Sequence, residues 1–586
     1  MPALQLTNFN IACATFGGFI CIFGLVSYLC KGRFYLSECL IALIAGLAVS
    51  PHAADFIRPL EYTAGSQSDL EAITLYFSRL VLAIQLVLAG VELPSRYVLT
   101  EWKPLSLLLG PGMTAMWLFT ALVTWAMVPD ISFLHALAVG ACVTPTDPVL
   151  SSAIVKGKYA DDNVPGDLQQ LIVAESGAND GLGYPFLFLA VYLIQYTGMN
   201  GAGQDNPSVH KAIGLWFGET LGYTILLSVV YGAVVGYLAK VALRWAEKRR
   251  YVDRENFLVF AVTLALFIMG TCGMIGSDDV LACFVAGNAF TIDDWFRLET
   301  VDDSVQPAID MLLNLSIFMW YGAICPWAKF AHNDIIPLYR LIVLGILVLL
   351  VRRIPIIFAM YKAIPQIRTP KHAAFVGFFG PVGVGAIFYL YLTRDYISQN
   401  ITVDGKPRED VQRLSDTIEL VIWFVVLCSV IVHGLAVPIS KLCHKILRIS
   451  RPSHDPLSSN NDSSFLSTLF NRKSTSLPFS QQPTMANTPA VSIVKPDVGG
   501  DEIRRLQRQQ MNLPARPAPA AAAAGTRAGS SSPTSDGDEI ELSEMRAMDR
   551  HENPTTWSES AATVACSSAN GPQHITFGGA RTSGIE

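Results

Sequence analysis

The sequence predicts an all-α, polytopic membrane protein with about thirteen transmembrane helices. Of its 586 residues, 51% are hydrophobic and only 15% are charged, whereas about a quarter of the residues in a soluble domain are charged. The mean hydropathy is +0.38, and the apolar residues come in blocks of about 20, the length that spans a hydrocarbon core. We therefore expect membrane lipid as the surrounding partner. The small net charge of −6 and the absence of a basic stripe argue against a nucleic-acid partner.

The apolar blocks follow one another along the first 450 residues, which we expect to form one membrane domain. They lie at 11–29, 36–54, 73–93, 104–128, 134–155, 168–196, 213–240, 256–275, 278–292, 309–328, 335–360, 372–393 and 417–440. The block at 278–292 is short enough for a re-entrant segment. No basic residue precedes the first block, so we expect a spanning helix there and not a cleaved signal peptide. The 11 cysteines form no C-x-x-C pair, which argues against a disulfide or metal framework.

Alternate loops are basic, which predicts the orientation of the chain in the membrane. The N-terminus is expected outside and the C-terminus in the cytoplasm. The loop at 293–303 departs from the pattern, because it carries several carboxylates on the expected inner side. The basic residues of the other inner loops are Lys31, Arg33, Arg96, Lys103, Lys156, Lys158, those of segment 240–250, Lys362, Arg368, Lys371, Lys441, Lys445 and Arg448.

The composition changes after about residue 450. Residues 451–586 are rich in Ser, Pro, Ala and Asn, which predicts a disordered cytoplasmic regulatory tail. Within it, the segment "RKSTSLP" at 472–478 places Lys473 three residues before Ser476 and Pro478 two residues after it. A phosphorylated Ser476 would resemble a 14-3-3 docking site, although Ser-rich tails also match such short motifs by chance.

The fifth block contains "CVTPTDPVLSSAIV", residues 142–155, which predicts a broken membrane helix. Pro145 and Pro148 have no N–H, so two backbone carbonyls lose their helical partners. In lipid such carbonyls are costly unless another group binds them. Asp147 puts a carboxylate beside the break, so a cation is one candidate partner. The alternative is a kinked helix in which Asp147 pairs with a buried Lys or Arg.

The sixth block contains "AESGANDGLGYPF", residues 174–186, with four polar side chains in an apolar helix. Ser176 and Asp180 are four residues apart and share one helical face, while Glu175 and Asn179 share the adjacent face. Polar groups at this depth indicate an interior pathway, although a purely structural polar cluster is an alternative.

A buried Glu175 requires a cation as a partner, because an isolated buried charge costs far more than a paired one. The candidates are Arg352 and Arg353 in the eleventh block. We expect one of them to pair with Glu175 and the other to extend toward the cytoplasmic surface. The sequence leaves open which arginine does which.

The twelfth block reads "FVGFFGPVGVGAIFYL", residues 375–390, and predicts a second interrupted helix around Pro381. The two interrupted helices are the fifth and the twelfth, seven apart, as in two six-helix inverted repeats. Paired interruptions at corresponding positions indicate the midplane site of a secondary transporter. We therefore expect crossed broken helices that hold an ion site.

Three further carboxylates have more than one interpretation. Glu92 lies at the inner end of the third block and suits either an access funnel or a surface helix end. Asp278 and Asp279 suit an ion path, and equally the cap and first turn of a helix.

At "TPTDPVL", "ESGANDG", Asp278-Asp279 and "GPVGVGAIF", the chain resembles the monovalent cation:proton antiporter superfamily, and above all the fungal plasma-membrane Na⁺/H⁺ antiporters. The resemblance covers about residues 1–450. It implies a thirteen-helix fold of two inverted repeats, divided into a dimerisation part and a mobile core, and hence a homodimer in the plasma membrane. It also implies a transporter and not an enzyme, with no cofactor, whose substrates are Na⁺ or Li⁺, or K⁺ as well, and H⁺.

The resemblance also assigns roles within the site. Asn179 holds a position that is Asp in the electrogenic branch, which favours one-for-one exchange, and Glu175 becomes the structural acid paired with an arginine. Two positions depart from relatives: Val384 replaces an arginine of animal exchangers, and Phe378 replaces a histidine of many fungal ones. The ion ligands that the family pattern implies are Asp147, Asp180, the Thr146 carbonyl and the Ser176 hydroxyl, with Glu92 near the Na⁺ through water.

The expected mechanism is competition between H⁺ and Na⁺ for carboxylate oxygens in a partly dry site. Two other classes also use membrane carboxylates, a cation channel and an intramembrane aspartyl hydrolase. The former would show no proton coupling, and the latter requires a water-activating constellation that the sequence lacks. Selectivity between Na⁺ and K⁺, stoichiometry, pH set-point and the partners of the tail are not determined by residue identities.

Overall fold

Several helices in the computed structural model begin at a polar residue whose side chain caps the first turn. The described residues are 7–155, 164–197, 208–403 and 406–449, all within one unit, residues 1–460. The predicted tail with Ser476 lies outside them. The N-cap side chains that accept a hydrogen bond from a backbone N–H three residues on are Thr7, Ser66, Ser132, Ser208, Asp253, Asp278 and Thr369.

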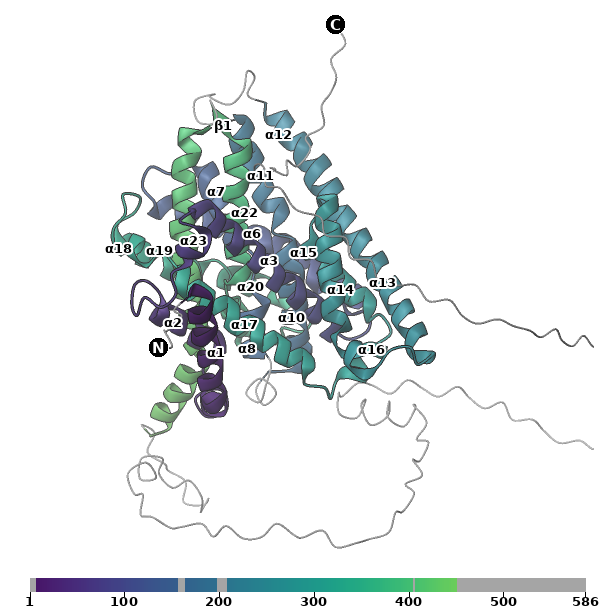
Figure 1. Cartoon of the computed structure of the whole chain (residues 1–586). Helices are drawn as coiled ribbons and strands as arrows, with labels where there is room; N and C mark the ends of the chain where they lie inside the picture. The colour runs from purple at the N-terminus through teal and green to yellow at the C-terminus, as the bar shows by residue number, and fades with distance from the viewer. Residues whose placement is uncertain (1–6, 156–163, 198–207, 404–405, 450–586) are drawn as a thin grey trace, which may run out of the picture. The chain divides into compact units, whose positions relative to one another are not determined.

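The described part of the chain is almost entirely helical (Figure 1). A two-stranded antiparallel hairpin, β1 (Thr402–Val403) and β2 (Lys406–Pro407), precedes the last helix. The π-helices are η1 (Tyr28–Arg33), η3 (Leu108–Gly112) and η5 (Trp216–Leu226), and the 3₁₀-helices are η2 (Pro59–Thr63) and η6 (Tyr361–Ala363). The α-helices are α1 (Asn8–Ser27), α2 (Glu38–Val49), α3 (Gln67–Glu92), α4 (Tyr97–Thr100), α5 (Trp102–Leu107), α6 (Met113–Met127), α7 (Phe133–Val143), α8 (Pro148–Val155), α10 (Gly166–Gly181), α11 (Tyr184–Thr197), α12 (Val209–Leu215), α13 (Leu227–Lys248), α14 (Arg254–Ile275), α15 (Asp279–Phe290), α16 (Trp295–Thr300), α17 (Val305–Ile324), α18 (Trp327–Ala331), α19 (Leu338–Val351), α20 (Ile354–Met360), α21 (Pro370–Phe378), α22 (Val384–Asn400) and α23 (Glu409–Ile449).

The predicted polytopic helical fold is confirmed. In the described part of the chain, eight helical segments are long and apolar enough to cross a membrane, and α2, α7 and α15 are shorter apolar helices. The predicted interruptions of the fifth and twelfth blocks separate α7 from α8 and α21 from α22. The sixth block, expected to be one span, is two helices, α10 and α11. Between them the Tyr389 ring packs against Gly183, where an added Cβ would lie 2.7 Å from the ring.

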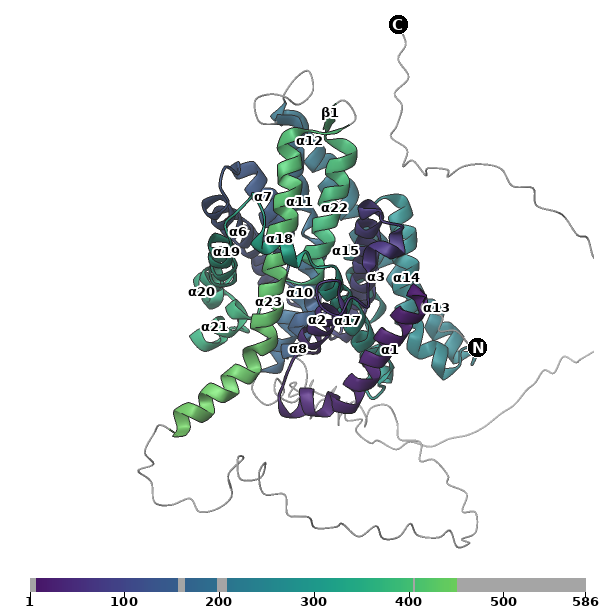
Figure 2. The same ribbon diagram turned by 60° about the vertical axis from the view of Figure 1, so that its left-hand side comes forward.

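The helices pack as two groups, which Figure 2 separates: α6, α7, α19, α20 and α21 lie on the left, and α3, α13 and α14 on the right. We call α2, α3, α13, α14, α15 and α17 the scaffold group, and α6, α7, α8, α10, α11 and α19 to α23 the crossing group. Helix α3 contacts members of both groups. Its residues 81–91 are buried on every side, as expected for a helix at the centre of a bundle.

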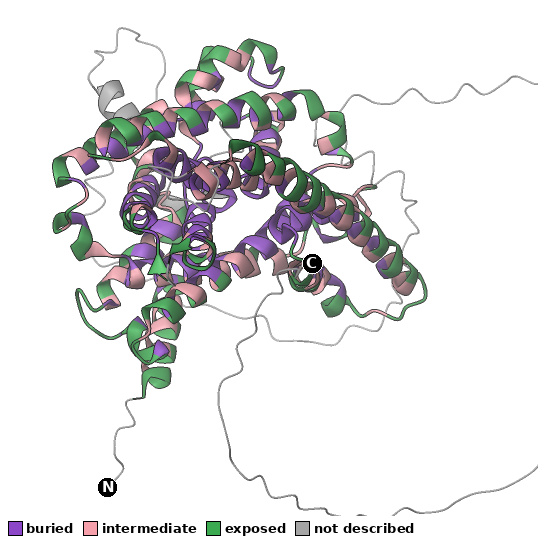
Figure 3. Cartoon of the chain, turned by 90° about the horizontal axis from the view of Figure 1, so that it is seen from above, coloured by how far each residue is buried: buried purple, intermediate pink, exposed green. Residues whose placement is uncertain are grey.

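Buried residues gather inside the bundle, and exposed ones cover its outer helices (Figure 3). Many exposed side chains are apolar, for example Leu226, Val234 and Leu238 on the long helical segment at 209–248. An outward apolar surface on a spanning helix is the surface that lipid covers.

The acidic loop at 293–303 lies beside basic residues of a neighbouring connection. Asp293 pairs with Arg244 at 2.7 Å, and Asp303 pairs with Arg254. The carboxylates that departed from the basic pattern of the inner loops are therefore matched by basic residues at the same end of the bundle.

Small residues set the spacing within the scaffold group. Gly232 and Gly236 of α13 face Ala282 and Ala286 of α15, so the two helices approach closely at positions four residues apart. A Cβ at Gly236 would lie 2.3 Å from the carbonyl oxygen of Ala286. Since the obstacle is backbone, the helices must separate to admit it.

We expect Gly236→Ala to lower the free energy of unfolding by about 1–3 kcal/mol, the cost of overpacking a close helix contact. The measurement is the thermal-unfolding midpoint of the purified protein in detergent. Gly270→Ala in α14 is the matched control, because nothing lies within 4 Å of its added Cβ. Equal midpoints for the two variants would contradict this account of the α13–α15 contact.

Candidate functional site

The two broken helices meet at their breaks. Residues 144–147 separate α7 from α8, and residues 379–383 separate α21 from α22. The backbone N–H of Asp147 donates to the carbonyl of Pro381 at 2.9 Å. One hydrogen bond thus joins the centres of the two interruptions, so four helix ends lie close together inside the protein.

The carboxyl-terminal helix ends at this crossing face a buried guanidinium. Arg352 donates to the carbonyls of Val143, Thr144 and Pro145 at the end of α7, and to that of Gly380 beyond α21. Such carbonyls have no partner within their own helix and carry partial negative charge. The positive charge of Arg352 satisfies both ends at once.

The expectation that one arginine extends toward the surface was wrong. Arg352 is 2% exposed, because the carbonyls freed at both breaks bind it inside the protein. The sequence indicated that Pro148 leaves the Thr144 carbonyl without its helical partner, and in the structure Arg352 donates to this carbonyl at 3.4 Å.

The amino-terminal helix ends face Asp147. Its carboxylate accepts hydrogen bonds from the N–H of Val149 at 2.9 Å, in the first turn of α8, and from that of Val384 at 3.1 Å, the first residue of α22. Helix amino termini carry partial positive charge and bind anions. Asp147, 1% exposed, is therefore held in place and stabilised as a carboxylate by backbone groups.

Asp180 differs from Asp147 in having no such support. It is 1% exposed, and neither carboxylate oxygen has a hydrogen-bond partner among the described residues. Helix α22 passes close by, so that a Cβ at Gly385 would lie 2.5 Å from Oδ1 of Asp180. The two aspartates are near enough for their charges to interact. A buried, unpartnered carboxylate is unfavourable, so a proton or a cation is required here.

Polar side chains of α10 tie this helix to the first break. The Asn179 amide donates to the Thr146 hydroxyl at 2.7 Å, and its carbonyl oxygen accepts from the Thr146 N–H at 3.1 Å. The Ser176 hydroxyl lies 3.1 Å from that of Thr146 and 3.3 Å from that of Ser151. The structure therefore brings Thr146, Ser176 and Asn179 together with the first break.

Glu175 forms a buried ion pair with Arg353. The two guanidinium nitrogens lie 2.6 and 2.7 Å from the two carboxylate oxygens, and both side chains are at most 3% exposed. Nε of Arg353 also donates to the carbonyl of Val376 at 2.9 Å. The pair thus connects α10 to the start of α20 and to α21. Of the two candidate arginines, Arg353 is the partner of Glu175.

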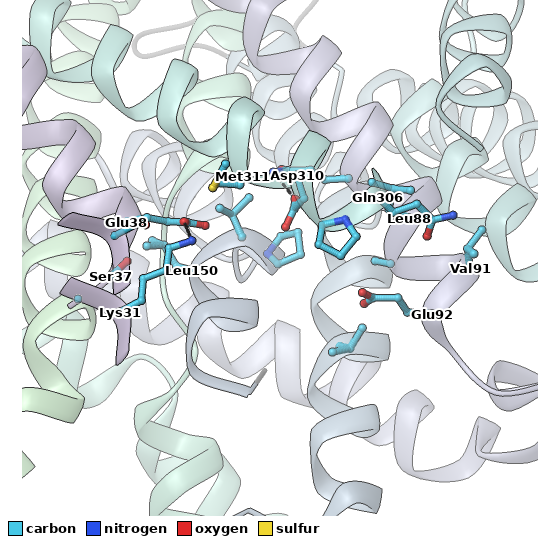
Figure 4. Close-up of a pocket in the computed structure, with 18 of the residues that line it drawn as sticks. Lys31, Ser37, Glu38, Leu88, Val91, Glu92, Leu150, Gln306, Asp310 and Met311 are labelled. Carbon is cyan, nitrogen blue, oxygen red and sulfur yellow. Dashed lines mark hydrogen bonds and ion pairs between the residues drawn. The ribbon is translucent and has the colours of Figure 1, made fainter. Parts of the chain in front are cut away.

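A cavity of about 890 Å³ reaches the crossing. Pro148 and Val149, beside Asp147, line it from α8, and Glu92 lines it from the end of α3. In Figure 4, Glu92 points into the cavity from one side, and the Lys31–Glu38 ion pair lies on the opposite side. The exposed Glu92 thus lies at the wall of an opening toward Asp147, as in the funnel interpretation.

Comparison with known proteins now identifies the family. Residues 19–440 match the family described as sodium/hydrogen exchanger, transmembrane. The chain belongs to this family. Na⁺/H⁺ antiporter 2 of Zygosaccharomyces rouxii is 37% identical over 447 residues, which cover 75% of this chain and 54% of that protein. A Na⁺/H⁺ antiporter of Saccharomyces cerevisiae is 38% identical over 448 residues, covering 75% and 44%. The chain thus spans about half the length of these curated relatives.

A solved structure of a sodium proton antiporter from Methanocaldococcus jannaschii has the same fold. The TM-score is 0.54 at 15% sequence identity, and the match covers 74% of this chain and 99% of that one. At this identity the likeness concerns the fold alone. This exchanger-family chain is accordingly a multi-pass membrane protein of a transporter family and not of an enzyme family, and the family does not favour a channel or an aspartyl hydrolase.

Asp278 and Asp279 lie at the start of α15. Oδ1 of Asp278 accepts from the N–H of Leu281 at 3.0 Å, the geometry of a helix N-cap, while its Oδ2 has no hydrogen-bond partner among the described residues. Asp279 pairs with Arg79 of α3 at 2.8 Å. These contacts match the cap and first-turn interpretation.

Two residues of α23 support the second break, a role that the sequence did not assign to them. The Ser429 hydroxyl accepts from the N–H of Val382 at 2.7 Å, and Nε2 of His433 donates to the carbonyl of Phe378 at 2.9 Å. Their signal was present: Ser429 and His433 are four residues apart, so they share one face of an otherwise apolar helix.

We expect Glu175→Gln to lower the free energy of unfolding by about 3–5 kcal/mol, because it leaves the buried Arg353 without a counter-charge. The thermal-unfolding midpoint in detergent measures this. Asp167→Asn is the control: it breaks the exposed pair with Arg368, and exposed pairs contribute about 0–1 kcal/mol. A midpoint for Glu175→Gln as high as that of the control would contradict the structural role of the pair.

Proposed function

We propose that this protein exchanges Na⁺ or Li⁺ for H⁺ across the membrane by alternating access. The observation that carries the proposal is the buried Asp180 carboxylate, which has no hydrogen-bond partner among the described residues and lies beside Asp147. Either a proton or a cation compensates such a charge, and the two compete for the same oxygens. The names of the yeast relatives, Na⁺/H⁺ antiporters at 37–38% identity, support the same activity.

In this proposal Asp147 and Asp180 bind the ion, and the Thr146 carbonyl and Ser176 hydroxyl complete its shell. Glu92, at the cavity wall, contacts the ion through water. A site with an uncompensated negative charge is costly to carry through a dry barrier. The crossing group therefore moves only when a cation or a proton occupies the site, and this restriction couples the two fluxes.

We further propose that the scaffold group forms a homodimer while the crossing group moves against it. A bridge between the groups must break in that motion: Arg394 of α22 pairs with Glu71 of α3 at 3.0 Å.

The basic loops support a cytoplasmic C-terminus, and we place the protein in the plasma membrane, exporting cytosolic Na⁺. Residues 451–586 are proposed as a regulatory tail, in which phosphorylated Ser476 recruits a 14-3-3-type protein. Partner capture that is unchanged in Ser476→Ala would remove this last assignment.

We expect vesicles that contain the purified protein to lose internal protons when Na⁺ or Li⁺ is added outside. A clamped membrane potential should not change the rate of this proton loss. Asn179 supplies no additional charge beside Asp180, so one cation replaces one proton. The measurement is internal pH under zero and imposed potentials, with Na⁺, Li⁺ and K⁺ in turn. Na⁺ conduction without proton movement would indicate a channel, and a response that depends on the potential would contradict one-for-one exchange.

We expect Asp147→Asn and Asp180→Asn each to abolish cation-dependent proton flux without loss of folded protein, since an amide cannot alternate between a proton and a cation. The readouts are vesicle flux and elution as a single species in detergent. Asp395→Asn, which removes an exposed carboxylate bound by Gln399, is the control and should transport normally. Retained flux in either site variant would contradict the assignment.

A further inference from the structure

A second polar cluster faces the cavity from the scaffold group. Helix α17 carries Gln306, Asp310 and Asn314 at intervals of four residues, so the three share one face of an otherwise apolar helix. Gln306 and Asp310 line the cavity, and Asn314 is 2% exposed. Polar residues inside a spanning helix are costly and commonly mark ion pathways.

Gln85 of α3 completes this cluster. Its amide nitrogen donates to Oδ1 of Asn314 at 2.5 Å and to Oδ1 of Asp310 at 3.2 Å. Because both partners of the nitrogen are acceptors, the orientation of the amide is determined, and its oxygen takes no part in these two hydrogen bonds. Gln85 is 4% exposed and lines the cavity, and this oxygen has no hydrogen-bond partner among the described residues. An unsatisfied buried acceptor costs about 1–3 kcal/mol.

The cluster lies on the way to the crossing. The cavity that Gln85 and Asp310 line also reaches Pro148 and Val149, next to Asp147, and the charge of Asp310 is near enough to act on the Asp147 carboxyl. Figure 4 shows Asp310 directed toward the centre of the cavity, between Glu92 and the Lys31–Glu38 pair. An ion that approaches Asp147 through this cavity therefore passes these oxygens.

We propose that Gln85 and Asp310 form a second cation site, which holds a partly hydrated alkali cation before it reaches Asp147. The ligands are the amide oxygen of Gln85 and the carboxylate of Asp310, and Asn314 positions Gln85. Oxygen ligands with a single carboxylate suit a hard monovalent ion that keeps part of its water shell. This site lies on the scaffold group, whereas Asp147 and Asp180 lie on the crossing group, so transfer between them loads the moving part. The inference rests on the proposed exchange.

The test is the dependence of proton flux on Na⁺ concentration, with Na⁺ supplied on the side to which the cavity opens. We expect Asp310→Asn and Gln85→Leu to raise KM for Na⁺ about three- to tenfold, a loss of up to about 1.4 kcal/mol, and to leave kcat within twofold. A waiting site affects capture of the ion and not the exchange step itself. Asp310→Glu, which keeps the carboxylate, should restore KM to within twofold of the unchanged protein.

Asp303→Asn is the matched control, because Asp303 lines the same cavity but pairs with Arg254. It removes the same charge without removing a proposed ligand, so its KM should change less than twofold. An equal rise in the control, or an unchanged KM or a lowered kcat in both cluster variants, would overturn the proposal. If Asp310→Asn does not fold, Gln85→Leu decides. Absence of exchange by the unchanged protein would refute the proposed function and not this site.

Discussion

The architecture depends on compensating four helix ends that are buried where two broken helices cross. Helix ends carry opposite partial charges, and inside a membrane protein no bulk water is present to solvate them. Here the two carboxyl-terminal ends face the guanidinium of Arg352, and the two amino-terminal ends face the carboxylate of Asp147. One cation and one anion thus satisfy both breaks. The backbone N–H of Asp147 also donates to the carbonyl of Pro381, so Asp147 is bound to the second break through both its side chain and its backbone.

Neighbouring helices hold this crossing in place through polar contacts at different depths. The Glu175–Arg353 pair connects α10 with α20 and α21, and Ser429 and His433 of α23 bind backbone groups around the second break. These contacts join helices of the crossing group to one another, so they hold that group together as one body. The scaffold group combines close contacts between small residues, such as those of α13 and α15, with polar contacts of its own, such as the Arg79–Asp279 pair between α3 and α15.

The two aspartates of the site are not equivalent. Backbone N–H groups donate to Asp147 and offset part of the cost of burying its charge, whereas Asp180 has no comparable donor among the described residues. A cation between them gains from both carboxylates, and a proton on Asp180 relieves the less stable charge. In the proposed exchange, this asymmetry lets a single site alternate between the two occupants. The glycines of α22 are part of this geometry, because a side chain at Gly385 would occupy the space beside Asp180.

The sequence alone determined the class, the breaks and the polar residues beside them. The length and apolarity of the blocks identify spanning helices. Residues that are costly in lipid unless another group compensates them also stand out in the sequence: Pro145, Pro148, Asp147, Asp180 and Glu175. Only the tertiary structure decided which partner each charge takes. Arg352 and Arg353 are adjacent and chemically identical, and their different roles follow from the direction each side chain takes at the end of α19. Gln85 of α3 and Asp310 of α17 are far apart in sequence, so no local pattern could pair them; the packing of the two helices does so.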